Sequence, residues 1–113
     1  MNYAIIGCGL IGKKRLAALP ACSKLVVACD TDLSRAKAMV ELAKTGRAVA
    51  SYGEAIADSQ IDVVVVATIN STLAEISAAA IRAGKHVLVE KPAGISVLEI
   101  DELIVGKLTI REQ

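Results

Sequence analysis

The sequence predicts an α/β fold: a single domain built on a doubly wound parallel sheet. Its 113 residues are enough for one ordinary domain. Hydrophobic residues make up 54% of the chain but aromatic residues only 2%, so the core must be aliphatic. Short apolar runs alternate with longer segments of helical periodicity, which is typical of parallel strands joined by crossover helices.

Six short apolar runs are expected to be strands: 3–6, 24–30, 48–51, 62–68, 86–90 and 107–110. In the run DVVVVAT at 62–68, the side chains that would point to either face of the strand are mainly apolar. That pattern is typical of a central parallel strand covered by helices on both faces.

Five helical segments are expected between these strands: 10–19, 32–44, a brief turn at 53–57, 72–83 and about 96–105. Helix-stopping residues follow three of them: Pro20, Gly46 and Gly84. Two helices are expected to begin with a capping box, in which Ser or Thr precedes Glu by three residues: Thr72 with Glu75, and Ser96 with Glu99.

Composition excludes several function classes. The chain has 13 Lys+Arg against 12 Asp+Glu, and this lack of a basic surplus argues against nucleic-acid or membrane-surface partners. The longest apolar stretch, 63–69, is too short to span a membrane, and no signal-peptide pattern opens the chain, so we expect a cytoplasmic protein. The three cysteines lack metal-ligand spacing and are expected to be reduced, buried and without a metal: Cys8, Cys22 and Cys29.

The sequence GCGLIG at 7–12 follows the first strand and opens the first helix. In this context Gly7 allows a tight turn, Gly9 lets a pyrophosphate approach the backbone, and Gly12 lets the helix pack closely on the strand. The N–H groups of Gly9, Leu10 and Ile11 are expected to face the phosphates at the helix N-terminus. The motif therefore predicts a Rossmann-type dinucleotide-binding fold.

An acid ends the second strand, which is the second signal for a dinucleotide. Asp30 lies 23 residues after Gly7, where such folds use a carboxylate to accept hydrogen bonds from the adenosine ribose. Because a carboxylate there repels a 2′-phosphate, the sequence favours NAD over NADP. Alternatively Asp30 only caps the next helix, a role that Thr31 or Asp32 can also fill. Arg35 is expected either near the adenine or beside a 2′-phosphate.

The run AGKHVLVEKP at 83–92 completes a set of motifs in order along the chain. With GCGLIG, Asp30 and ATIN at 67–70, it closely resembles the glucose–fructose oxidoreductase / inositol dehydrogenase / rhizopine catabolism (Gfo/Idh/MocA) family over essentially the whole chain. The resemblance implies an NAD(P)-dependent oxidoreductase that transfers hydride between its cofactor and a sugar, polyol or related hydroxyl substrate. It also implies a C-terminal α+β domain that supplies most of the substrate site.

The resemblance gives roles to the residues that end the predicted strand 86–90. Lys91 is the candidate catalytic residue, expected to orient the substrate hydroxyl and help its proton leave; the alternative is a solvated surface lysine. Glu90 is expected to contact the nicotinamide ribose or to hold Lys91. A cis Lys91–Pro92 bond fits the same resemblance. Lys85 is interpreted as a helix-end cation and His86 as a structural residue at the strand start.

The segment after the central strand is expected to line the nicotinamide side through Ala67, Thr68 and Asn70. For Asn70 a helix N-cap is nearly as good an interpretation. The chain departs from the family pattern in having Ile69 in place of Pro and Leu73 in place of His, which removes one polar contact.

The chain stops at Gln113, so we expect the substrate domain to be absent and the small-molecule substrate to bind through it. Two hypotheses follow. One is the nucleotide-binding domain of an oxidoreductase; the other is a stand-alone dinucleotide-binding or oligomerising module without turnover. In either case the chain alone is expected to bind dinucleotide with little dehydrogenase activity. Apolar surface left by a missing domain also predicts a homo-oligomer.

Overall fold

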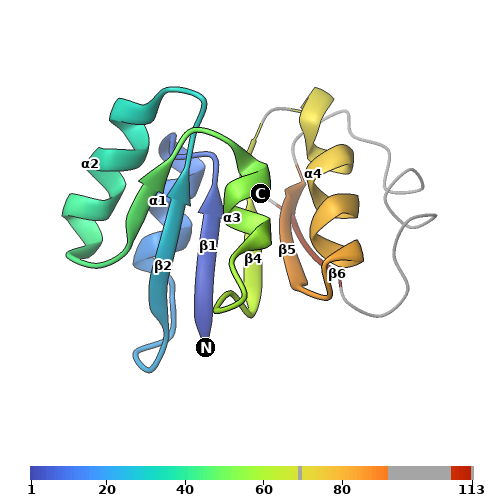
Figure 1. The fold of residues 1–113 in the computed structure, drawn as a ribbon, viewed down its shortest axis with the longest axis horizontal. Helices are drawn as coiled ribbons and strands as arrows, with labels where there is room; N and C mark the ends of the chain where they lie inside the picture. The colour runs from blue at the N-terminus through green and yellow to red at the C-terminus, as the bar shows by residue number, and fades with distance from the viewer. Residues whose placement is uncertain (69, 92–107, 113) are drawn as a thin grey trace.

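A parallel sheet of six strands forms the centre of the protein in a computed structural model that describes residues 1–68, 70–91 and 108–112 (Figure 1). The strands are β1 (Asn2–Ile6), β2 (Lys24–Cys29), β3 (Arg47–Val49), β4 (Val63–Val66), β5 (His86–Lys91) and β6 (Leu108–Glu112). Their order is β3-β2-β1-β4-β5-β6, and every neighbouring pair is parallel. The predicted doubly wound parallel sheet is confirmed.

Four described helices connect the strands: α1 (Leu10–Ala17), α2 (Leu33–Ala43), α3 (Tyr52–Ala57) and α4 (Asn70–Arg82). The chain runs outward from β1 to β3, then returns to β4 on the other side of β1. In an open α/β sheet this reversal opens a crevice at the carboxyl ends of the strands, which is where ligands bind. None of the described helices combines the length and apolarity needed to cross a bilayer.

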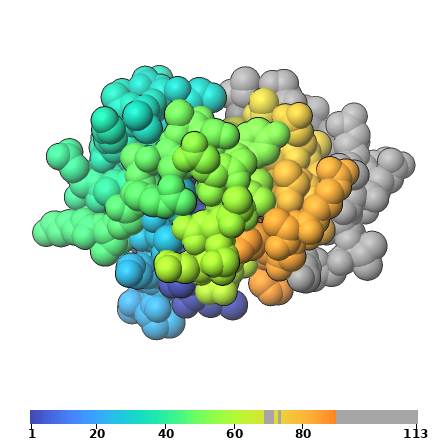
Figure 2. Space-filling view, viewed as in Figure 1, coloured from blue at the N-terminus to red at the C-terminus, as the bar shows by residue number. Residues whose placement is uncertain are grey.

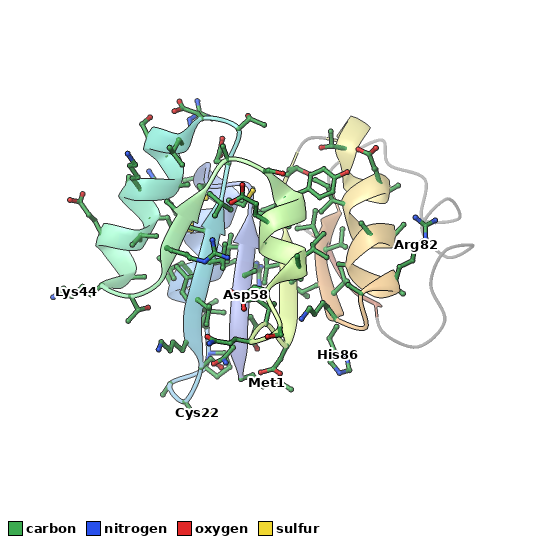
Figure 3. All side chains as sticks on the ribbon, in the orientation of Figure 1. Met1, Cys22, Lys44, Asp58, Arg82 and His86 are labelled. Atoms are coloured by element: carbon green, nitrogen blue, oxygen red, sulfur yellow. The ribbon has the colours of Figure 1, made fainter. Side chains whose placement is uncertain are left out.

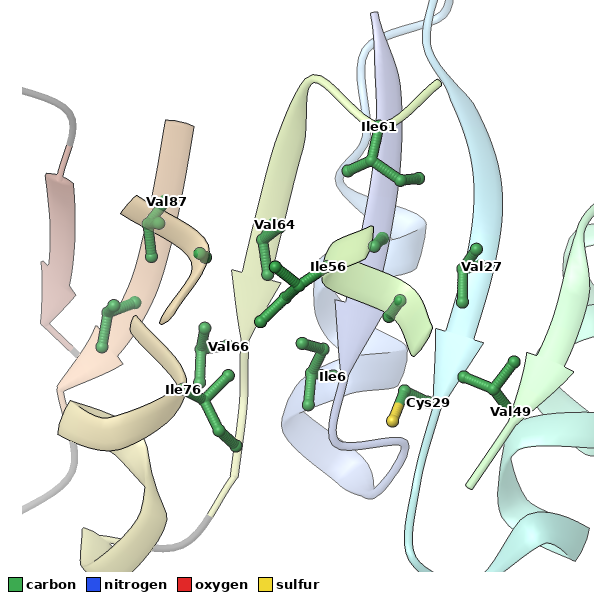
Figure 4. Packing of buried hydrophobic residues seen from close by; sticks show 14 residues of the cluster. Ile6, Val27, Cys29, Val49, Ile56, Ile61, Val64, Val66, Ile76 and Val87 are labelled. Atoms are coloured by element: carbon green, nitrogen blue, oxygen red, sulfur yellow. The ribbon is translucent and has the colours of Figure 1, made fainter. Parts of the chain in front are cut away.

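Two aliphatic clusters cover the two faces of the sheet. On one face, α3 and α4 pack on the strands, with Ile56 and Ile76 among the contacts (Figure 4). In the space-filling view these two helices cover much of the near face (Figure 2). On the other face, α2 contributes Met39. Val64 and Val65 in β4 belong to opposite clusters and are fully buried, which confirms β4 as a central strand.

The helix ends show which of the predicted helix-stopping residues end a helix. Gly84, at φ +81°, ends α4: its N–H bonds the Ile81 carbonyl, and the next N–H bonds that of Ala80. The helix α2 ends at Ala43, one residue before the predicted end, and Lys44 rather than Gly46 is its left-handed cap. The first helix ends at Ala17, before the predicted position 19, because a residue preceding proline disfavours helical geometry.

The predicted start of α4 is wrong. The helix begins at Asn70, two residues before the predicted start, so Thr72 lies inside its first turn.

Two side chains differ from their predicted surroundings. Cys22 is exposed, because it lies in the loop before β2, whereas Cys8 and Cys29 are buried as predicted. Lys85 is predicted to be a helix-end cation, but its ammonium group does not interact with α4 alone: the residue is only 9% exposed, and its Nζ donates to the carbonyls of Asp58 and Ile61 at 2.8 Å each. The predicted helix at 96–105, its Ser96–Glu99 capping box and the isomer of the bond to Pro92 lie outside the described residues.

Candidate functional site

A cleft of about 450 Å³ lies at the carboxyl edge of the sheet. The loops after β1, β2, β3 and β4 converge on it. Seven of the predicted site residues line it: Gly7, Gly9, Asp30, Thr31, Arg35, Ala67 and Thr68. The crevice expected from strand order is therefore present, and the glycine-rich loop and the acid of β2 share it.

The cleft also contains residues that sequence reasoning missed. They follow β3 or lie on α4: Ala50, Ser51, Tyr52, Thr72 and Ile76. A signal for the first three was available, because the loop after the third strand must emerge at the same edge as the loop after the second. Thr72 and Ile76 lie in the first two turns of α4.

The remaining predicted site residues are placed by the helices and strands that carry them. Leu10 and Ile11 form the first turn of α1, where Leu10 is 76% exposed. Asn70 is the first residue of α4. Glu90 and Lys91 are the last two residues of β5, so the backbone brings them to the carboxyl edge as predicted, while their side chains lie outside what the structure describes.

Two of the three motif glycines are required by the protein itself. At Gly7, with φ +98°, an added Cβ would collide with the Ala67 carbonyl group. At Gly12, an added Cβ would collide with the Gly7 carbonyl oxygen and come within 3.3 Å of Met39 Cε. These glycines hold β1, β4 and α1 in close contact, as the motif predicts.

Gly9 differs from its two neighbours in the motif. No protein atom outside its chain neighbours lies within 4 Å of the position that a Cβ would take, and its backbone is extended, with φ −81° and ψ −156°. Nothing in the fold therefore demands a glycine here. Gly9 also lines the cleft, so a side chain at this position would occupy the space over the loop.

The N-terminus of α1 presents donors beside that open space. The first hydrogen bond of the helix runs from the Lys13 N–H to the Gly9 carbonyl at 3.0 Å. Gly9 is the N-cap residue, so it provides no side chain to cap the helix. The first-turn N–H groups, which include those of Leu10 and Ile11, are directed out of the helix end. With the helix dipole they form a site suited to an anion.

Asp30 connects this loop to β2. Its Oδ2 accepts the Cys8 N–H at 2.9 Å, and its Oδ1 accepts the Asp32 N–H at 2.8 Å. Asp32 is the N-cap of α2 and accepts the Ser34 N–H at 3.1 Å. Of the two alternatives, Asp32 therefore performs the capping, and the Asp30 carboxylate remains in the cleft.

Two charged side chains near the cleft, Arg35 and Asp32, are paired. Arg35 Nε lies 3.7 Å from the Asp32 carboxylate, and both side chains are more than half exposed. Hydrogen bonds from the Ser34 hydroxyl and N–H lower the pKa of Asp32, with a smaller contribution from Arg35. Arg35 thus lines the cleft with its charge shared with Asp32.

The two buried thiols of this region are poor nucleophiles. Burial raises the pKa of Cys8 to about 12, with the Asp30 carboxylate adding to the effect. Burial, followed by Asp30 and Glu54, raises the pKa of Cys29 to about 11. Among the described residues, no group of His, Cys, Asp and Glu side chains is arranged to hold a metal ion.

Comparison with known proteins identifies the family. The family described as "Oxidoreductase family, NAD-binding Rossmann fold" (GFO_IDH_MocA) matches residues 1–106. The chain belongs to the Gfo/Idh/MocA oxidoreductase family. As in other members, the fold is an NAD(P)-binding Rossmann fold, and the chain corresponds to the nucleotide-binding domain of dehydrogenases.

Two curated relatives are 36% identical to this chain over the residues that align with it. Inositol 2-dehydrogenase 2 of Saccharopolyspora erythraea is 36% identical over 95 residues, which is 81% of this chain and 28% of that protein. The 1,5-anhydro-D-fructose reductase of Ensifer adhaerens is 36% identical over 107 residues, which is 93% of this chain and 32% of that protein. The chain thus spans about 30% of the length of these relatives.

Solved structures of the family have the same fold and different cofactors. KijD10, a 3-ketoreductase from Actinomadura kijaniata in complex with NADP, superposes with a TM-score of 0.82 at 29% identity, covering 91% of this chain and 32% of that chain. The WlbA dehydrogenase of Chromobacterium violaceum, in complex with NADH and UDP-GlcNAcA, gives 0.80 at 27% identity, covering 100% and 34%.

Proposed function

We propose that residues 1–113 form one dinucleotide-binding domain of an NAD-dependent oxidoreductase. The observation that carries this proposal is Gly9, which the fold does not require and which faces open space at the N-terminus of a helix. A glycine is needed there only if something outside the protein approaches the backbone, and the donors at this helix end suit a diphosphate.

Strand order suggests how the cofactor would lie. Along the carboxyl edge, Asp30 follows β2, the glycine-rich loop follows β1, and Thr68 follows β4, in that spatial order. With the diphosphate over the loop, the adenosine would lie between Asp30 and the Ser51–Tyr52 pair. The nicotinamide half would then lie toward Ala67, Thr68 and the end of β5.

NAD is the cofactor that the cleft favours over NADP. The Asp30 carboxylate would accept ribose hydroxyls and repel a 2′-phosphate. Arg35 is the residue that could offset this repulsion, but it already shares its charge with Asp32 at 3.7 Å. We therefore expect NAD⁺ and NADH to bind at least about tenfold more tightly than NADP⁺.

Bound nicotinamide dinucleotide would supply the hydride acceptor or donor for oxidation or reduction at a sugar, polyol or related hydroxyl carbon. Lys91 ends β5 at the edge where the nicotinamide half would lie. Its ammonium group would orient the substrate hydroxyl, and its amine form would take the proton that leaves. Glu90 would hold the nicotinamide ribose or Lys91, and the substrate's other contacts would come from a partner domain.

Binding without turnover is the second candidate function. The described residues that line the cleft belong to the part expected to hold the cofactor, whereas hydride transfer also needs a substrate held against the nicotinamide. This candidate also includes self-association: Leu42, 62% exposed at the far end of α2, is an apolar surface residue that a second copy could cover. Sedimentation of the purified chain at increasing concentration tests this part.

Titration of the purified chain with NAD⁺, NADH and NADP⁺ tests the proposal, with Gly9→Ala as the decisive variant. Its Cβ meets no protein atom, so we expect an unchanged melting temperature and an affinity for NADH at least about tenfold weaker. Ser59→Ala is the control, since Ser59 is exposed in the turn before β4, at the opposite edge of the sheet from the cleft. Unchanged NADH affinity in Gly9→Ala would refute the site. A dehydrogenase assay over a panel of polyols then separates an enzyme from a binding module.

A further inference from the structure

Asp30 contacts the glycine-rich loop directly, in addition to lying where a ribose would bind. The bond from the Cys8 N–H to Asp30 Oδ2 joins residues 22 apart in the sequence, at 2.9 Å. Cys8 lies between Gly7, which has a positive φ, and Gly9, the N-cap of α1. The carboxylate therefore holds the peptide that comes immediately before the open part of the loop.

The end of β2 supplies further bonds to the same loop. The Gly7 N–H donates to the Cys29 carbonyl at 2.8 Å, and the Cys8 Sγ donates to the same oxygen at 3.3 Å. On the other side, Gly7 packs closely against the Ala67 carbonyl. Cys29 and Ala67 meet the loop through backbone carbonyls, whereas Asp30 holds it through its side chain, and Asp30 also lines the cleft.

The carboxylate has acceptor capacity left after these bonds. Two oxygens offer about four acceptor sites, and the Cys8 and Asp32 N–H groups occupy two of them. The remaining sites can accept the two hydroxyls of a ribose without loss of the bond to the loop. One side chain can therefore serve both parts of a nucleotide at once.

We propose that Asp30 is a positioning residue for the diphosphate site: by holding the Cys8 N–H it sets the direction of the N–H groups of the loop, while it binds the ribose directly. This inference rests on the proposed dinucleotide site. Asp30 should therefore affect the affinity of ligands that have no ribose hydroxyls. An acid that only recognises the ribose would not affect the affinity of such ligands. It also means that replacing Asp30 to admit a 2′-phosphate weakens diphosphate binding.

The test compares ADP with 2′,3′-dideoxy-ADP, which keeps the diphosphate and lacks both ribose hydroxyls. Both are titrated by calorimetry into the wild-type chain, Asp30→Asn and Asp32→Asn. Asp32→Asn is the matched control, because it removes one negative charge from the same corner and Asn is an equally good N-cap. Its carboxylate is engaged with Ser34 and Arg35 rather than with the loop. Both variants lose one negative charge at this corner, and both are titrated with Arg35→Gln as background, which removes the gain from the Arg35 that Asp32→Asn would release.

For Asp30→Asn we expect ADP affinity to fall about fiftyfold and dideoxy-ADP affinity to fall about fivefold relative to Asp32→Asn. Equal dideoxy-ADP affinities in the two variants, with ADP weakened only in Asp30→Asn, would overturn the inference and leave ribose recognition intact. No binding of ADP to the wild-type chain would overturn the proposed function itself. If circular dichroism shows that Asp30→Asn is unfolded, Asp30→Ser is measured by the same criteria.

Discussion

The polar groups at the amino edge of the sheet are hydrogen-bonded differently from those at the carboxyl edge. At the amino edge, loops are closed by bonds within the chain: Lys85 Nζ donates to the carbonyls of Asp58 and Ile61, and the Asn2 N–H donates to the Asp62 carboxylate at 2.8 Å. At the carboxyl edge, the first turn of α1 directs its donors outward, Gly9 faces open space, and Asp30 keeps acceptor sites unused.

This difference separates stability from binding within one small domain. Buried polar groups without partners are costly, so an edge that serves only the fold pairs its groups internally. An edge that binds a ligand leaves donors and acceptors for that ligand. Substitutions at the amino edge should therefore change unfolding, and those at the carboxyl edge should change affinity. Gly7 is an exception, because it lies in the binding loop and also meets β4.

The cysteines give the largest expected contrast between the edges. A pKa of about 12 for Cys8, against an ordinary value of 9.0, leaves about a thousandfold less thiolate at neutral pH. Cys22 is exposed in the loop before β2, at the amino edge (Figure 3). We expect a thiol reagent at pH 7.5 to label Cys22 alone in the folded chain and all three cysteines in urea.

Mass spectrometry after timed labelling identifies the modified residue, and Cys22→Ser is the control that should abolish native labelling. Rapid modification of Cys8 or Cys29 in the folded chain would show that the loop opens readily. The glycine-rich loop would then not be held rigidly by the protein on the side away from the cleft.

Gly7→Ala should damage both properties at once. A Cβ at φ +98° is strained and collides with the Ala67 carbonyl, so we expect a loss of about 2–4 kcal/mol in unfolding free energy. Because β4 must move away from the loop, NADH affinity should also fall by at least about tenfold. Urea denaturation and NADH titration measure the two effects, with Gly9→Ala as the variant that should lose affinity alone. An unchanged unfolding midpoint would contradict the close packing of β1 on β4.

Much of this architecture follows from local signals in the sequence. Four consecutive valines in β4 can be buried on both faces only in the middle of a sheet, and GCGLIG after a strand fixes the turn into α1. The same signals placed Asp30 beside the loop, because both end neighbouring parallel strands. The site could therefore be predicted where it depends on strand order.

Contacts between distant loops could not be predicted in this way. Lys85 follows a helix, so a role at that helix end was the natural interpretation, yet its Nζ binds the loop that follows α3. The Cys8–Asp30 bond requires a rotamer and a register that no spacing rule supplies.

Lys85→Met tests the amino edge. The substitution keeps the length of the side chain but leaves the carbonyls of Asp58 and Ile61 without their charged donor, so we expect unfolding free energy to fall by about 2–3 kcal/mol. NADH affinity of the folded protein should stay within about twofold, because Lys85 lies at the opposite edge from the cleft. Lys24→Met, at an exposed position in the same edge, is the control. A loss of affinity without a loss of stability would reverse the assignment of the two edges.

Acid should weaken the amino edge through Asp58, the smallest of these effects. The Gln60 N–H, at 2.9 Å, and then Arg47 lower the pKa of the Asp58 carboxyl below its ordinary value of 3.8. A lowered pKa means that the charged form stabilises the fold above the ordinary value, and that this contribution is lost as the pH falls through the folded value. Urea midpoints of the wild type should therefore drop more steeply below about pH 4 than those of Asp58→Asn. The effect is modest because the ion pair with Arg47 is partly exposed and screened. Parallel curves for the two proteins, with Glu41→Gln as a surface control, would remove Asp58 from the groups that stabilise this edge.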